Sequence, residues 1–160
     1  MAIDPNALIP ELTSHLLEWL PRQPWFDATG DEISSISVIR LELIRSEWPL
    51  VMWAPFEVHI DGAPIIVQTV LAVAPEVPDA VPDNAIIGEL TTSAGPVMAF
   101  DALGDPALAT VFATHVAAGA SPSTVKAMTH EPWGTTLELA DQWELTIFRR
   151  VESGAHPDVE

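Results

Sequence analysis

Residues 56 to 73 carry the pattern that constrains the fold most strongly. Phe56–Ile60 alternates apolar and polar side chains, as a strand with one covered face does. Asp61-Gly62 comes next, and this pair favours the tight turn of an antiparallel hairpin. Ile65–Val73 is then apolar on both sides of the chain, which is typical of a strand covered on both faces. We therefore expect an antiparallel sheet with Ile65–Val73 near its centre.

Further strands and two helices are predicted around this hairpin. Ile33–Arg45 also alternates, but its phase slips between Val38 and Ile39, which indicates a bulged or bent strand. The other expected strands are Ala85–Leu90, Pro96–Phe100, Ser123–Met128, Thr135–Ala140 and one that begins at Trp143, and the expected helices are Pro10–Leu20 and Pro106–Ala118. This order of elements predicts an α+β fold.

The charge balance excludes several classes of partner. Six basic residues against 23 acidic ones give a formal net charge of −17. Binding of nucleic acid or of an anionic membrane depends on clustered Lys and Arg, so we expect neither. The amino terminus lacks the basic and apolar segments of a signal peptide, and no apolar run is long enough to span a membrane. We expect a cytoplasmic protein whose acidity keeps it soluble or attracts a basic protein.

No catalytic, metal-binding or cofactor-binding motif is present. The five histidines stand singly, without a partner at metal-ligand spacing, and there is no cysteine. The chain has neither a nucleophile elbow nor a phosphate-binding loop with its lysine. We therefore expect no resident metal or cofactor and no catalytic residues.

Four blocks in a fixed order resemble one enzyme family, the actinobacterial maltokinases. The blocks are Leu16–Phe26, the hairpin at Asp61-Gly62, Phe100–Pro106, and Phe148-Arg149-Arg150 with Gly154 and Pro157–Glu160 behind it. The resemblance implies a maltokinase amino-terminal cap over residues 1–121, a curved antiparallel sheet packed on two helices and similar to cystatins. It also implies that residues 122–160 are a remnant of kinase small-lobe strands, packed as one unit with the cap.

Three positions depart from what the resemblance would require of a kinase. In the family the third small-lobe strand carries a phosphate-binding lysine, and Thr146 stands at that position here. Trp133 occupies the loop that would cover the nucleotide phosphates, and an indole fills space that they need. Glu160 corresponds to the glutamate that would pair with the missing lysine. Because the chain also ends where the catalytic lobe would follow, we expect no ATP binding and no enzyme activity.

Three hypotheses about the function follow from these observations. The favoured one is a stand-alone, non-catalytic interaction or regulatory module that binds a protein or a second copy of itself. Maltokinases work in trehalose, maltose and glycogen metabolism and can associate with trehalose synthase, so the resemblance implies that neighbourhood. The alternatives are a sugar-binding module that uses Trp48, Trp53 or Trp133 as stacking surfaces, and a fragment of a maltokinase-type kinase.

The segment Trp48–Trp53 is the candidate interface. It contains two indoles, a methionine and two aliphatic side chains without a single charge, although the chain is strongly acidic. Because it lies between two expected strands, we predict a position near a sheet edge, where Trp48, Leu50, Met52 and Trp53 contact a partner. The alternative is that both indoles pack beneath the first helix.

Overall fold

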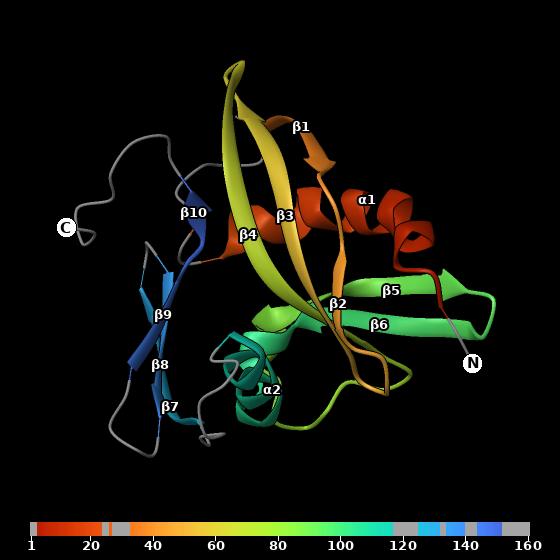
Figure 1. Cartoon of the computed structure of the whole chain (residues 1–160). Helices are drawn as coiled ribbons and strands as arrows, with labels where there is room; N and C mark the ends of the chain where they lie inside the picture. The colour runs from red at the N-terminus through yellow and green to blue at the C-terminus, as the bar shows by residue number, and fades with distance from the viewer. Residues whose placement is uncertain are drawn as a thin grey trace.

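The computed structural model describes residues 3–23, 26, 33–116, 125–131, 134–139 and 144–151 (Figure 1). The helices are α1 (Ile9–Trp19) and α2 (Pro106–Val116), and short 3₁₀ turns lie at Pro5–Leu8, Leu20–Arg22, Asp83–Ala85 and Ala102–Gly104. The strands are β1 (Ile33–Val38), β2 (Glu42–Arg45), β3 (Leu50–Ile60), β4 (Ala63–Ala74), β5 (Ile86–Thr92), β6 (Gly95–Asp101), β7 (Val125–Glu131), β8 (Gly134–Leu139), β9 (Glu144–Phe148) and β10 (Arg150–Val151).

The predicted hairpin forms the long central pair β3–β4. Its ladder runs without a break from Leu50 opposite Val73 to Ile60 opposite Ala63. Asp61 and Gly62 connect the two strands with φ angles of 51° and 82°, the left-handed values that a two-residue hairpin turn needs. The second half of β4, residues 69–74, is buried at every position, so both of its faces are covered, as its apolar sequence predicts.

A larger sheet is built outward from this hairpin. In the described residues its strands follow the order β1-β3-β4-β6-β5, with β2 also paired to β3 and β10 also paired to β4. The expected strand over residues 33–45 is divided into β1 and β2, because the chain between them leaves the ladder at the predicted phase slip. There the Ile39 amide still donates to the Pro55 carbonyl at 2.9 Å.

The two faces of this sheet bury separate apolar clusters, one beneath each helix. Alternate residues of β3 divide between them, so that Met52 and Phe56 face α1 whereas Val51 faces α2. Leu12, Leu16 and Trp19 line the buried side of α1, and Leu108 and Phe112 that of α2. Burial of these side chains is the main favourable term for the fold.

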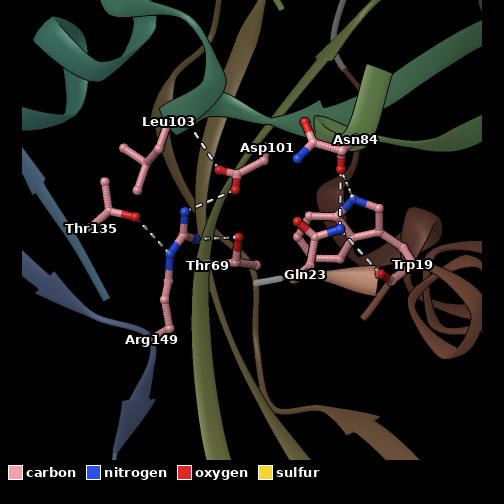
Figure 2. Close-up of polar contacts among 8 residues, drawn as sticks. All are labelled: Trp19, Gln23, Thr69, Asn84, Asp101, Leu103, Thr135 and Arg149. Carbon is pink, nitrogen blue, oxygen red and sulfur yellow. Dashed lines mark hydrogen bonds and ion pairs between the residues drawn. The ribbon is translucent and has the colours of Figure 1, made fainter. Parts of the chain in front are cut away.

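Polar contacts fix α1 against the edge strand β5. The Glu11 carboxylate accepts from the Thr91 amide, and the His15 ring lies 2.8 Å from the Glu89 carbonyl. In the turn just before β5, the Asn84 carbonyl accepts from the Trp19 indole at 3.0 Å and from the side-chain amide of Gln23, which follows α1 (Figure 2). The helix therefore covers backbone groups that an exposed strand edge would leave unpaired.

A second antiparallel sheet, β7-β8-β9, lies beside the first, on the opposite side from α1 (Figure 1). Its three strands agree with those predicted over residues 123–148. The whole is a mixed α+β fold, a curled antiparallel sheet with two helices and a separate three-stranded sheet, as expected. The predicted boundary between residues 121 and 122 falls outside the described residues, and the division into 1–121 and 122–160 stays a prediction.

Candidate functional site

One of the three positions at which the resemblance to maltokinases predicts nucleotide-binding residues, Thr146, lies in the three-stranded sheet. Thr146 lies in β9 directly opposite Thr136 of β8, and their hydroxyl oxygens are 3.2 Å apart. Both side chains are half-buried. The position of the expected lysine therefore carries a neutral side chain that already has a neutral hydrogen-bond partner. Trp133 and Glu160, the other two predicted positions, lie outside the described residues.

Arg149 joins the two sheets. It follows β9 and has a fully buried side chain. The guanidinium donates to Asp101 of β6 at 2.8 Å, to the Thr69 hydroxyl of β4 at 3.1 Å and to the Thr135 hydroxyl of β8 at 3.4 Å (Figure 2). The other oxygen of Asp101 accepts from the Leu103 amide at 3.0 Å. A buried carboxylate and a buried guanidinium thus satisfy each other between the sheets.

The position of Arg149 follows from a gap in the ladders along β4. One edge of β4 pairs with β10 at Ile66 and Val67, and with β6 from Leu71 onward. Thr69 lies between the two ladders, and the guanidinium reaches its hydroxyl there. In the described residues neither ladder includes Thr69, and the Arg149 side chain occupies this stretch of the β4 edge.

Gln68 extends this junction to the candidate interface segment. Its backbone amide donates to the Arg149 carbonyl at 2.7 Å, and its side-chain amide donates to the Phe148 carbonyl at 2.5 Å. Its side-chain oxygen accepts from the indole of Trp53 at 2.9 Å. Trp53 is therefore linked through one glutamine to the end of β9.

The four predicted interface residues do not form one surface. Leu50 and Met52 are buried in the cluster beneath α1. Trp53 is half-buried, with the guanidinium carbon of Arg40 5.1 Å from its ring centre. Trp48 is 38% exposed. The expected position at a sheet edge is wrong for Val51 to Trp53, because this part of β3 pairs with β2 on one side and with β4 on the other. The interface role of the four residues stays a prediction.

The open edge on this side of the molecule belongs to β2. In the described part of the chain β2 pairs with β3 alone. Ile39, just before this strand, and Leu43 within it are 53% and 41% exposed, and Trp48 follows shortly after. Neither Ile39 nor Leu43 was predicted from the sequence as a site residue. The signal was the phase slip at Ile39, since a strand that changes phase cannot bury every apolar side chain.

Neither a metal site nor a membrane helix is found in the described residues. They hold no group of three or more His, Asp or Glu side chains arranged to bind a metal ion. None of their helices has the length and apolar character needed to cross a membrane. His15 contacts the Glu89 carbonyl and His59 the Glu57 carboxylate, so these two rings have local partners instead.

Comparison with known families identifies the larger sheet. The model of the maltokinase N-terminal cap domain matches residues 19–105, which is more than half of the chain. The chain belongs to this family. The matched region runs from the end of α1 through β6 and holds the two long strands of the cap sheet. No curated protein matches the chain.

The Arg149 junction crosses the boundary of this match. Asp101 and Thr69 lie within the maltokinase-cap region, whereas Arg149 and Thr135 lie beyond it. The three-stranded sheet is thus attached to the cap through an ion pair, through Gln68 and through the short ladder between β10 and β4. Buried polar contacts therefore join the maltokinase-cap region to the three-stranded sheet.

Proposed function

We propose that this maltokinase-cap protein is a non-catalytic module that acts by binding a protein. The observation that carries the proposal is Thr146, which stands in β9 where the resemblance to maltokinases requires a lysine. Its hydroxyl is engaged with Thr136 across the ladder. Phosphoryl transfer depends on cations that hold the nucleotide phosphates and neutralise the charge that develops on them.

The electrostatics at this position support the proposal. A triphosphate carries several negative charges, and a chain with a net charge of −17 repels it unless local cations compensate. The arginine next to β9 does not serve that purpose, since the Arg149 guanidinium is buried against Asp101. A threonine offers a neutral hydroxyl that cannot replace a lysine ammonium.

A sugar-binding role has less support. Sugars stack on open aromatic faces, and one face of the Trp53 ring is covered by Arg40. Its indole N–H is also engaged, with Gln68. Membership of the cap family agrees instead with a role among proteins of trehalose, maltose and glycogen metabolism in the cytoplasm. A direct titration with purified trehalose synthase tests that link.

Calorimetric titration with Mg-ATP tests the loss of catalysis. The wild-type protein should show no binding below the millimolar range, and it should not phosphorylate maltose under conditions in which an active maltokinase does. The matched variant is Thr146→Lys, which returns the cation to the same strand. If only that variant gains affinity for Mg-ATP, the replaced side chain is the cause. A micromolar dissociation constant for the wild type would overturn the proposal.

A further inference from the structure

The β2 edge combines an unfilled backbone ladder with exposed apolar side chains. Within the described residues β2 has a single neighbour, β3, so the outward N–H and C=O groups of its edge are open to a further strand. Five large apolar side chains are exposed in the described residues, and three of them lie at or near this edge: Ile39, Leu43 and Trp48. An edge of this kind is a template for strand addition.

A bulge determines how the charges on this edge are arranged. Glu42 pairs with Trp53 and Leu43 with Met52, but Arg45 pairs with Val51, so Ile44 is the extra residue. Glu42 and Arg45 therefore each lie one ladder step from Leu43, on opposite sides of it along the strand. They also point to the same face of the sheet, because their partners on β3 are two residues apart.

The resulting charge pattern is complementary to itself. A two-fold axis through Leu43, perpendicular to the sheet, places Leu43 opposite Leu43 of a second copy. It also places Glu42 opposite Arg45 of that copy, so that both charged residues of the strand meet one of opposite sign. Arg40 and Arg45, two of the six basic residues of this chain, lie in β2 or just before it, and their charges balance those of Glu42 and Glu47 although the chain carries −17.

We propose that two copies of this chain associate by antiparallel pairing of their β2 edges around Leu43. This inference rests on the proposed binding function and names its partner as the same protein. The paired edges complete each other's backbone ladders and cover Leu43, with Ile39 and Trp48 beside it. The existing contact between Arg40 and Glu42 has an N–O distance of 3.7 Å between exposed side chains, and such a pair exchanges partners at little cost. In the contact of Arg45 with Glu47, at 3.8 Å, Glu47 is exposed, whereas Arg45 is half-buried and also donates to the Trp48 carbonyl at 3.3 Å.

Sedimentation equilibrium at about 0.15 M salt tests the association. The wild type should form a reversible dimer with a dissociation constant below about 100 µM. We expect this dimer to be weak, because two short strand edges bury less than the roughly 1,600 Å² of a standard interface. Leu43→Lys should raise the dissociation constant at least about tenfold, because it places two ammonium groups opposite each other. The matched control is Leu17→Lys on α1, whose side chain is 40% exposed and which changes the net charge equally. It should leave the dimer intact.

A complementation experiment tests which residues of the two β2 strands lie opposite each other. Its result cannot be produced by misfolding of the variants. Glu42→Arg and Arg45→Glu each place like charges opposite one another and should each be monomeric. Mixed together they should form a heterodimer, because each copy then supplies the charge that the other lacks. An unfolded variant could not be rescued in this way, and circular dichroism records the fold of each protein alone.

Three outcomes would overturn the inference: a wild type that stays monomeric to about 100 µM, an unchanged dimer in Leu43→Lys, or a mixture that fails to associate. A monomeric wild type that also fails to bind Mg-ATP would leave the proposed function standing. A dimer that binds Mg-ATP with micromolar affinity would instead remove the proposed function and keep the self-association.

Discussion

Removing the guanidinium of Arg149 should detach the three-stranded sheet from the cap. In Arg149→Ala the Asp101 carboxylate, which is itself buried, loses the cation that lies 2.8 Å away. The hydroxyls of Thr69 and Thr135 lose a donor at the same time. Water cannot replace the guanidinium fully, because the surrounding side chains leave both charged groups almost without exposed surface.

The expected size of the effect is large compared with the stability of a single domain. Breaking a buried ion pair by deleting one partner costs about 3–5 kcal/mol. The free energy of unfolding of such a domain is about 5–15 kcal/mol. With a urea dependence of about 2 kcal/mol per molar, the unfolding midpoint should fall by about 2 M.

Urea titration followed by tryptophan fluorescence measures this shift. Arg40→Ala is the control, because its pair with Glu42 is exposed and should contribute at most about 1 kcal/mol. A double-mutant cycle uses Arg149→Met, Asp101→Asn and the variant that carries both changes. The double variant should lose less stability than the two single variants added together, with a coupling energy of about 1–3 kcal/mol. A loss below about 1 kcal/mol in Arg149→Ala, or single effects that simply add, would refute the buried pair as the junction.

Two comparisons between variants examine the packing of the cap. Gly88→Ala should lower the melting temperature by several degrees, because a methyl group there would lie 2.5 Å from the His15 ring, and the additional change His15→Ala should recover part of the loss. Trp48→Ala should change the unfolding free energy by less than about 1 kcal/mol, whereas Trp53→Ala should cost more, since only Trp53 is half-buried and hydrogen-bonded to Gln68. Chemical denaturation of both variants compares them, and equal losses would contradict this difference.

The local elements could be predicted because each has its own local cause. The Asp61-Gly62 turn requires left-handed backbone angles that these two residue types adopt readily. The start of α2 is set by Asp105, whose carboxylate accepts from the Ala107 amide at 2.9 Å, with Pro106 in the first turn. In both cases the residues that determine the structure are neighbours in the sequence.

The junction could not be predicted in the same way, because its partners are far apart in the chain. Arg149 meets Asp101 across 48 positions and Thr69 across 80. An arginine that follows a strand is usually exposed, and nothing local indicates that this one enters the interior. The decisive circumstance is the gap in the ladders along β4, which exists only after β6 and β10 have both paired with it.

The segment Trp48–Trp53 shows why uncharged composition alone is a poor guide to a binding surface. A strand sends successive side chains to opposite faces, so Leu50 and Met52 enter the core while Trp53 turns the other way. Six uncharged residues in a row therefore indicate a strand with neighbours on both sides as readily as an exposed patch. In the proposed self-association the second copy meets Trp48 and the edge of β2, where Glu42 and Arg45 lie on either side of Leu43 and favour a partner of complementary charge.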